Sequence, residues 1–540
     1  GGENFYKMSQ FFKANDDTRL VHYEGINMDR RFEDTTDIES HMYMPPDNIK
    51  NYLKNNRKKP FISCEYAHSM GNSTGCLDKY VKLTEEEPLY QGGFVWDYID
   101  QVLENKASNG EKFYAYGGDF YDRPTDYDFS ANGIVYADRT LSPKMTQVKY
   151  CYQNFKIDVK EDSFIIYNKN LFLNSSKYEC FATLLENGKE IRKDFININV
   201  DAGDIKQYKL PYNIFDMNKL KEYTIIVSII LKEDELWAKK GYEIAFGQLN
   251  LGKMIIEKDK IEKPILIDDF NNIGIICKDC SIIFSKIKGG LISYKIGDKE
   301  LVMPNFWRAP LQNDIGASLH REMAVWKANS MYIKGEIVGV EENKDNITVN
   351  IRYILPLTDA KVYGEYKVFG DGTIDIELTM EAVNSSQYIP EFGFLIKMPL
   401  DCNTLTWYGR EGETYSDRKT GHKIGIYSQK VEDALEKYVY PQDCGNHTET
   451  RYAHIYNDSN VGLKIYGDNF NISALNYTPH QLENANHLFE LPKPFETVLK
   501  ICSNQMGVGG DNSWGAWPHQ EHMIKTDKEL KCKFSIKGIY

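Results

Sequence analysis

The residues best suited to chemistry stand together in one stretch, PFISCEYAHSMGNS at 60–73. A short apolar run headed by Pro60 predicts a buried strand, and it ends at Glu65 with His68 three residues further on. A carboxylate at the carboxyl end of a buried strand is where α/β barrels keep their catalytic groups. The simpler interpretation is a structural glutamate paired with a nearby cation, which a lone strand-end carboxylate would favour. Glu65 is therefore a candidate catalytic residue that its surroundings have to support.

The elements expected around Glu65 belong to a parallel α/β sheet. Apolar spacing predicts a helix at 4–14 and another that starts at Pro46, and four strands at 19–23, 37–43, 61–64 and 90–96. Four helix–strand units make half of an eight-stranded barrel, and a half barrel leaves two unpaired edges. Because the chain also opens at Gly1 without an initiator methionine, we expect further N-terminal material. Glu24 follows the first predicted strand and is a second candidate carboxylate.

Three domains are expected along the 540 residues. Residues 1–145 form the half barrel and close with a long polar, aromatic loop at 119–139, whose length indicates a functional segment. Residues 146–255 alternate apolar and polar side chains, which predicts an antiparallel β-sandwich. Residues 262–540 repeat this alternation and predict a larger all-β domain.

Composition excludes some classes of partner. A formal net charge of −13 argues against nucleic acid or an anionic membrane surface as a partner. No apolar run is long enough to span a bilayer. The ten cysteines are scattered, and the one close pair, Cys277 and Cys280, predicts two strand residues beside a tight turn rather than a zinc site.

Six motifs together resemble one family. They are CEYAHSMGNS at 64–73, QGGFVWDYIDQ at 91–101, YGGDFYDRPTDYDFSANGIVYADR at 116–139, NFWRAPLQNDIG at 305–316, WYGREGETYSDRKTG at 407–421 and QMGVGGDNSWG at 505–515. In this order they resemble the bacterial β-galactosidases of glycoside hydrolase family two. The resemblance implies the second half of a TIM barrel, a linking sandwich and a large β-supersandwich. It also implies retaining hydrolysis of terminal β-D-galactose from lactose-like β-galactosides, through a covalent galactosyl intermediate on Glu65.

The resemblance assigns roles residue by residue. Glu65 matches the nucleophile, Tyr43 matches the tyrosine that orients it, and Glu24 receives no catalytic role. The acid/base glutamate lies in an Asn-Glu-Ser segment of the family, and this chain contains no such triplet. We therefore expect little or no turnover from residues 1–540 alone. The residues that match the galactose pocket are Met42, His68, Trp96, Asp126 and Asn132.

Metals, partners and location also follow from the resemblance. The backbone oxygen of Phe129 and the side-chain oxygen of Asn132 match ligands of the family's sodium ion. Oxygen ligands of this kind are the ones that hard cations prefer. Most ligands of its magnesium ion match nothing in this chain. The expected partners are a β-galactoside, the missing N-terminal half and further copies of the chain, in the cytoplasm. At the position of the family's stacking tryptophan, counting back from 505 gives Val498, which puts second-sugar preference in doubt.

Two alternatives remain open. A non-catalytic carbohydrate-binding or assembly module would suit the long β-rich region and the absent acid/base residue, but it has no need of Glu65 beside Tyr43 and His68. A related family-two enzyme, such as a β-glucuronidase or β-mannosidase, would lack the large C-terminal domain that 262–540 resembles.

Overall fold

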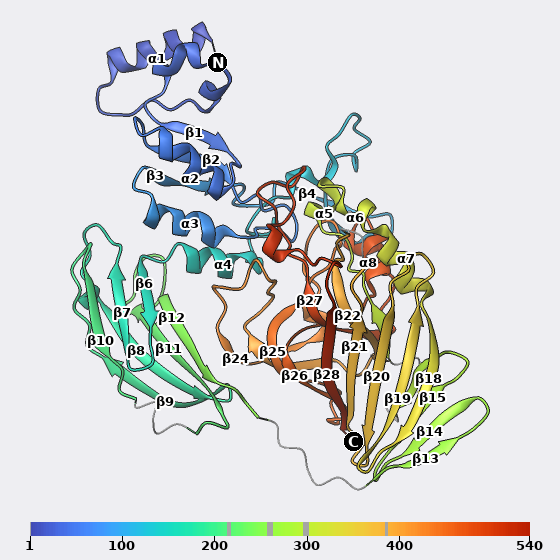
Figure 1. Ribbon diagram of the computed structural model, residues 1–540. Helices are drawn as coiled ribbons and strands as arrows, with labels where there is room; N and C mark the ends of the chain where they lie inside the picture. Colours follow the sequence, from blue (N-terminus) through green and yellow to red (C-terminus); the bar gives the residue numbers. More distant parts are fainter. Residues whose placement is uncertain (1, 213–217, 256–262, 295–301, 384–386, 540) are drawn as a thin grey trace.

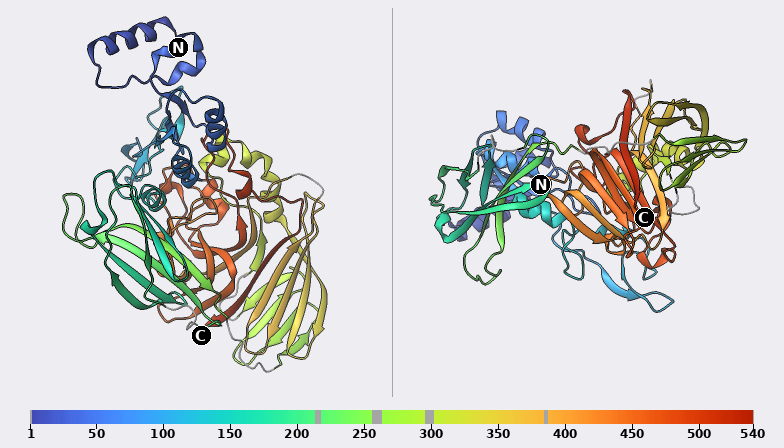
Figure 2. Two further views of the ribbon diagram at one scale, coloured as in Figure 1. Left: turned by 60° about the vertical axis from the view of Figure 1, so that its left-hand side comes forward. Right: turned by 90° about the horizontal axis from the view of Figure 1, so that it is seen from below.

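The computed structural model describes residues 2–212, 218–255, 263–294, 302–383 and 387–539. Along the chain the architecture passes from a small α/β part through a β-sandwich to a large β-domain (Figure 1). Helix α1 lies at one tip of the molecule, away from the β-domains, in two views (Figures 1 and 2). Among the described residues no helix is long and apolar enough to cross a membrane.

The α/β part is built on three parallel strands in the order β1-β2-β3. Apolar residues one helical turn apart, such as Ile49 with Leu53 and Tyr80 with Leu83, are buried against this sheet. The elements are α1 (Glu3–Asn15), β1 (Glu39–Met42), α2 (Pro46–Asn55), β2 (Phe61–Tyr66), α3 (Leu77–Glu86) and β3 (Tyr90–Val95). The expected partial barrel is thus confirmed in class, with helices between parallel strands.

The strand expected at 19–23 is wrong, and its residues run as an extended segment into the 3-10 turn η1 (Glu24–Met28). Side chains take up its donors: the Val21 N–H donates to the Asp37 carboxylate at 2.8 Å, and the Tyr23 N–H donates to Thr36 Oγ1 at 3.1 Å. Because a strand needs a ladder of backbone partners, these side-chain contacts leave the segment outside the sheet. Glu24 accordingly starts a 3-10 turn and does not end a strand.

The loop at 119–139 is followed by a β-sandwich. Two sheets, β10-β7-β6 and β12-β11-β8-β9, enclose a core that includes Phe164, Ile225 and Val227. The alternating burial of β6 is the pattern expected when one face of a strand packs inward. The elements between are β4 (Leu103–Lys106), β5 (Lys112–Ala115), η3 (Tyr127–Ser130), α4 (Lys144–Cys151), β6 (Phe155–Val159), β7 (Ser163–Asn168), η4 (Ser175–Lys177), β8 (Tyr178–Glu186), β9 (Lys189–Ile196), β10 (Ile205–Lys209), β11 (Glu222–Leu231) and β12 (Glu243–Gly252).

The C-terminal domain is one large antiparallel sheet that curves over its own core, with three strands branching from the main path. Cys277 and Cys280 flank the turn between its strands β14 and β15, and the Cys277 N–H donates to the Cys280 carbonyl at 2.9 Å. Its strands are β13 (Ile265–Asp268), β14 (Asn272–Ile276), β15 (Ser281–Ser285), β16 (Gly290–Tyr294), β17 (Val302–Asn305), β18 (Lys334–Glu342), β19 (Asn346–Ile354), β20 (Val362–Phe369), β21 (Ile374–Met380), β22 (Glu391–Pro399), β23 (Thr404–Arg410), β24 (Ile424–Lys430), β25 (His447–Tyr456), β26 (Gly462–Leu475), β27 (Glu496–Gln505) and β28 (Leu530–Ile539). Its helices are α5 (Gln312–Gly316), α6 (Leu319–Glu322), α7 (Ala324–Tyr332) and α8 (Pro479–Glu483), with short 3-10 turns η2 (Arg30–Thr35), η6 (Val431–Ala434), η7 (Leu488–Glu490) and η8 (Gln520–His522) elsewhere in the chain.

Candidate active site

Glu65 and Tyr43 meet where β1 and β2 end. The two strands are parallel, and a register shift after His41 places Met42 beside Glu65. The Tyr43 N–H donates to the Glu65 carbonyl at 2.8 Å, and the Tyr43 hydroxyl donates to Glu65 Oε2 at 2.7 Å. Tyr43 adopts a left-handed backbone with φ 52°, which turns its side chain back onto the carboxylate.

The phenol of Tyr43 stays a hydrogen-bond donor. Burial, followed by the hydrogen bond to Glu65, raises the pKa of Tyr43 well above its ordinary value. A protonated phenol holds one oxygen of the Glu65 carboxylate and leaves the other for a reacting atom. Tyr43 is therefore hydrogen-bonded to Glu65 in the structure, which is the contact that the family resemblance implies.

His68 anchors an aromatic cluster beside this pair. Its imidazole is 1% exposed, and Nδ1 lies 2.8 Å from Ser513 Oγ. Its ring stacks on Phe129 at 5.5 Å between centroids and meets the edge of Trp514 at 5.1 Å. Burial, and next the charge of Lys144, lower the pKa of His68 to about 4, so the ring is neutral at neutral pH.

Trp514 is a site residue that sequence reasoning missed. It also packs edge-on against Tyr43 at 4.7 Å and lies 5.8 Å from Phe129. Its side chain is 47% exposed, so one part of the indole faces solvent beside Glu65 and His68. The sequence did contain a signal for Trp514, because this residue belongs to the QMGVGGDNSWG motif at 505–515.

Val498, the residue that matches the family's stacking tryptophan by position, lies buried in the C-terminal domain. It is 2% exposed in β27, between Lys397 of β22 and Leu475 of β26. A buried strand position with a partner on each side offers no surface to a ligand. The exposed aromatic ring beside Tyr43 and His68 is that of Trp514, and the second-sugar preference stays an open prediction.

Asn132 and Phe129 present oxygens that fit a hard cation. The Asn132 side chain is 4% exposed, and its amide nitrogen donates to the Phe129 carbonyl at 3.1 Å. Its Oδ1 is buried with no hydrogen-bond partner among the described residues. An orphaned buried amide oxygen beside a backbone carbonyl matches the donor chemistry of sodium.

The other predicted site residues surround this centre less closely. Trp96 follows β3, is 39% exposed, and accepts the Ser69 N–H at its carbonyl at 2.8 Å. Met42 is 46% exposed at the end of β1. Asp126 is exposed on the loop that carries Phe129, and its backbone carbonyl accepts the Phe129 N–H at 3.2 Å.

A buried polar network fixes the loop that follows Glu65. The Lys144 ammonium, 1% exposed, donates to the carbonyls of Ser69, Gly71 and Gly133 at 2.6–2.8 Å. Burial lowers the pKa of Lys144 to about 8. The fold thus uses one cation to gather three carbonyls from two chain segments beside the site.

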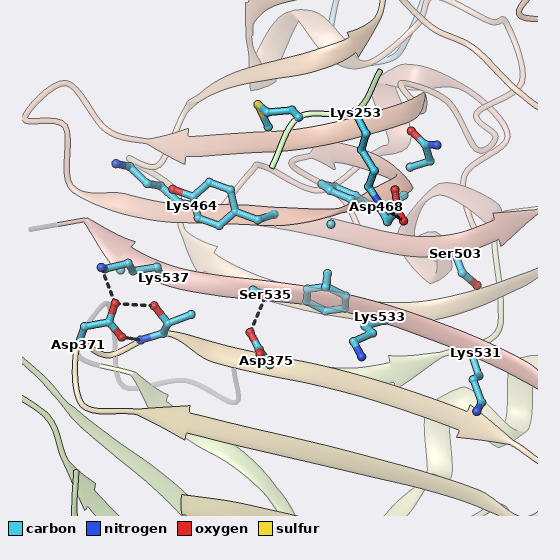
Figure 3. Close-up of a pocket in the computed structure, with 18 of the residues that line it drawn as sticks. Lys253, Asp371, Asp375, Lys464, Asp468, Ser503, Lys531, Lys533, Ser535 and Lys537 are labelled. Atoms are coloured by element: carbon cyan, nitrogen blue, oxygen red, sulfur yellow. Dashed lines mark hydrogen bonds and ion pairs between the residues drawn. The ribbon is translucent and has the colours of Figure 1, made fainter. Parts of the chain in front are cut away.

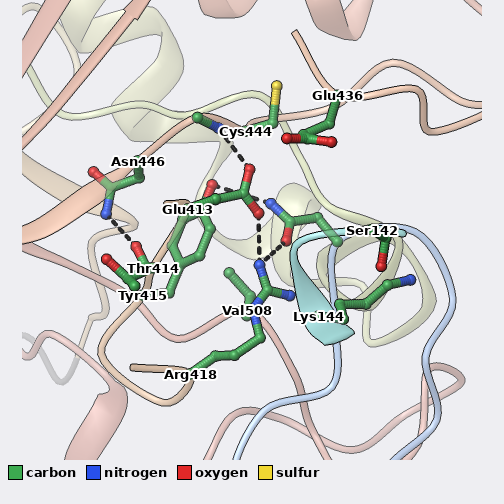
Figure 4. A network of polar contacts seen from close by, with 12 residues as sticks. Ser142, Lys144, Glu413, Thr414, Tyr415, Arg418, Glu436, Cys444, Asn446 and Val508 are labelled. Carbon is green, nitrogen blue, oxygen red and sulfur yellow. Dashed lines mark hydrogen bonds and ion pairs between the residues drawn. The ribbon is translucent and has the colours of Figure 1, made fainter. Parts of the chain in front are cut away.

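The C-terminal domain holds the same loop from the other side through Arg418. This guanidinium is fully buried and donates to Glu413 and to Asn72 Oδ1, both at 2.6 Å, and to the Ser73 carbonyl. Figure 4 shows the Arg418 and Glu413 side chains pointing toward one another. The Ser73 hydroxyl in turn donates to the His68 carbonyl at 2.8 Å, so the network reaches the site directly.

Three family models match the chain in succession. Residues 1–157 match the TIM barrel domain of the glycosyl hydrolases family 2, residues 164–252 match β-galactosidase domain 4, and residues 277–536 match the β-galactosidase small chain. This order is the order of the α/β part, the sandwich and the large β-domain. The chain belongs to the bacterial β-galactosidases of glycoside hydrolase family 2.

Individual relatives agree with the family models. A β-galactosidase of Halalkalibacterium halodurans is 40% identical over the whole of this chain and 54% of its own length. A β-galactosidase of Priestia megaterium is 38% identical over the whole of this chain and 53% of its own length. This chain spans about half the length of the curated relatives it matches. A crystal structure of a putative aldose 1-epimerase from Escherichia coli K12 matches 49% of this chain and 98% of its own, at 9% identity and a TM-score of 0.29.

Proposed function

We propose that this chain carries the nucleophile of a retaining β-galactosidase. In the first step one oxygen of Glu65 attacks the anomeric carbon of a terminal galactose, and the bond to the leaving oxygen breaks. In the second step water attacks the same carbon, the bond to Glu65 breaks, and the second carboxylate takes the proton from the water, which releases galactose and the free Glu65 carboxylate. The observation that carries this proposal is the 2.7 Å contact from the Tyr43 hydroxyl to Glu65 Oε2 at the carboxyl ends of parallel strands.

The surrounding residues are proposed to bind the sugar through hydrogen bonds and aromatic contacts. Neutral His68 offers one ring nitrogen to a sugar hydroxyl while the other lies against Ser513. The exposed faces of Trp96 and Trp514 suit the apolar C–H faces of a sugar ring. Met42, Asp126 and Asn132 complete the proposed galactose pocket.

Sodium is proposed to bind at the Phe129 carbonyl and Asn132 Oδ1. The bound ion would supply a fixed positive charge that orients a sugar hydroxyl. Within this chain, Asn132 positions the loop that carries Phe129, whose ring stacks on His68. For magnesium we propose ligands mostly outside residues 1–540.

The leaving group needs a proton from a second carboxylate, which in a retaining pair lies about 5–5.5 Å from the nucleophile. We propose that this acid comes from the half of the relatives' length that lies outside residues 1–540. The apolar side chains exposed on α1 support a partner there: Phe5, Met8, Phe11 and Phe12 are 43–65% exposed. Within the described ranges no further strand pairs with either edge of the β1-β2-β3 sheet, which leaves both edges available to strands of a partner.

Hydrolysis of lactose-like β-galactosides in the cytoplasm, by an enzyme with more than one copy of the chain, completes the proposal. All ten cysteines are thiols rather than disulfides, which suits a reducing compartment.

Covalent trapping tests the nucleophile. A 2-deoxy-2-fluoro-galactoside with a dinitrophenolate leaving group needs no acid catalyst, because that leaving group departs unprotonated. It is incubated with the chain, alone and with the N-terminal half of the Priestia megaterium relative. Mass spectrometry is expected to find the fluorogalactosyl group on the peptide with Glu65 in the mixture, and none in Glu65→Gln.

The same experiment separates the alternatives. Label on Glu65 excludes a non-catalytic carbohydrate-binding module, because such a module has no competent nucleophile. Intact protein without label, in a mixture that binds galactose, would overturn the proposal in favour of that module. The matching fluoroglucuronide and fluoromannoside are expected to label at least tenfold more slowly than the galactoside, and faster labelling by either would assign a related activity.

A further inference from the structure

Basic side chains line up across three strands of the C-terminal domain, far from Glu65. In the register of the sheet, His454 of β25 is opposite Lys464 of β26, and Lys464 is opposite Lys537 of β28. Residues directly opposite in antiparallel strands have their side chains on the same face, where like charges destabilise the pair. A Lys–Lys pair at this position therefore opposes folding unless an anion compensates it.

Only one of these two lysines has its anion within the chain. The Lys537 ammonium pairs with Asp371 at 2.8 Å. Of the residues that the structure describes, none forms an ion pair with Lys464, which is only half-buried. Burial, and next the charge of Lys464, lower the pKa of His454 to about 4, so the histidine is neutral and adds no third charge. Asp371 thus offsets one of the two positive charges, and the charge of Lys464 is left without an anion among the described residues.

These lysines open into a groove of 780 Å³, a size typical of ligand sites. Five lysines and three aspartates line it, so its lining carries a net charge of +2 in a chain of net charge −13. Figure 3 shows Lys464 and Lys537 on neighbouring strands, with Lys533 and Lys531 further along the groove. Lys531 pairs with Glu529 at 3.0 Å, Lys533 pairs with Glu377 at 3.2 Å, and Lys253 pairs with Asp468. Of the five lining lysines, Lys464 is therefore the one without an ion pair within the part of the chain that the structure describes.

An aromatic ring stands beside the unpaired lysine. Tyr466 follows Lys464 by two residues on β26, which places both side chains on the same face, and it lines the groove. Across the strand pair it is opposite Tyr452 of β25. An aromatic face next to an uncompensated cation is suited to a sugar ring that bears a negative group.

We propose that this groove is an accessory binding site for an anionic saccharide. The carboxylate, sulfate or phosphate of the sugar would lie between Lys464 and Lys537, with the sugar ring against Tyr466. The site is separate from Glu65, since β26 and β28 belong to the C-terminal domain and lie apart from β1 and β2 in Figure 1.

Calorimetric titration of the 540-residue chain tests the site with four probes: galactose 6-sulfate, galactose 6-phosphate, trigalacturonate and neutral galactotriose. At least one anionic probe is expected to bind tenfold or more tightly than galactotriose, with affinity falling as salt rises. The anion that binds most tightly identifies the source of the charge. Equal affinity for galactotriose, or no binding by any anionic probe, would overturn the proposal.

Two variants assign the binding to this groove. Lys464→Met is expected to weaken the anionic probe about tenfold or more, because it removes a charge-assisted hydrogen bond. Lys361→Met is the matched control and is expected to change nothing, because Lys361 is an exposed lysine just before β20 that pairs with Glu381. Equal loss in both variants would show non-specific attraction and refute the site. Glu65→Gln is expected to bind the anion like the native chain.

Stability gives an independent readout. Lys464→Met also removes the repulsion from Lys537, so its melting temperature without ligand is expected to be equal to or higher than that of the native chain. A clearly lower melting temperature would show that Lys464 serves the fold, and would contradict a lysine retained for binding.

Discussion

Replacing Arg418 with methionine should release the loop that follows Glu65. The guanidinium is fully buried, and its partner Glu413 is 4% exposed, so the substitution leaves a buried carboxylate without its cation. Breaking a buried pair from one side costs about 3–5 kcal/mol. The carbonyl of Ser73 and the side chain of Asn72 lose a donor in the same step.

The double variant Glu413→Gln/Arg418→Met separates the charge from the lost donors. With both charges gone, the remaining cost is that of unsatisfied acceptors, about 1–3 kcal/mol. The double variant is therefore expected to be about 2 kcal/mol more stable than Arg418→Met alone. Urea unfolding followed by tryptophan fluorescence measures both free energies of unfolding.

The loss in Arg418→Met should also depend on pH. Burial raises the pKa of Glu413 to about 7 from its ordinary value near 4.5, so protonation stabilises the folded state below 4.5 and that stability is lost as pH rises through 7. Without Arg418 the pKa of Glu413 rises further. The variant is therefore expected to lose more stability relative to the native chain at pH 8 than at pH 5.

Arg352→Met is the matched control for this network. Arg352 pairs with Glu336 at 2.5 Å on the surface, where the side chains are 53% and 36% exposed, and its loss is expected to cost less than about 1 kcal/mol. The reasoning is refuted if Arg418→Met costs no more than Arg352→Met, or if adding Glu413→Gln lowers stability further. Slower fluorogalactosyl labelling of Glu65 in Arg418→Met would extend the effect to the site.

Two further predictions concern the site itself. Tyr43→Phe removes the hydroxyl that donates to Glu65, a charge-assisted hydrogen bond of about 1.5–3 kcal/mol, so the labelling rate should fall roughly 10- to 150-fold while the melting temperature changes little. His68 has its pKa lowered to about 4 by burial, so the unfolded chain binds more protons between pH 4 and 6.5. Stability should therefore be complete above pH 6.5 and fall as pH drops toward 4, and His68→Gln should flatten this part of the profile.

A specific result would contradict each of these two predictions. Labelling of Tyr43→Phe at the native rate would show that the phenol does not orient Glu65. An unchanged slope of stability between pH 4 and 6.5 in His68→Gln would assign the acid sensitivity to other groups, such as buried His422 and His447.

The amino-acid sequence by itself determined the local elements and the order of the domains. Helix α2 begins at Pro46 and strand β2 at Phe61 as expected, because proline in a first turn and an apolar run act within a few residues. The link between Glu65 and Tyr43 came from the family motifs, and the structure places the two residues at the ends of neighbouring parallel strands. The failed strand at 19–23 has the opposite cause: its local pattern suited a strand, but Asp37 and Thr36 side chains took its donors.

Only the tertiary structure decided what surrounds Glu65. Ser513 lies 445 residues from His68 in the sequence, and Trp514 follows it into the site. Periodicity in a sequence carries no information about a contact over that distance. Counting positions within a motif pointed to Val498, which its strand partners bury in the core. The uncompensated charge of Lys464 is likewise invisible in sequence, because it depends on which strand the sheet places beside β26. Local patterns fix elements, whereas the pairing of distant elements fixes the site.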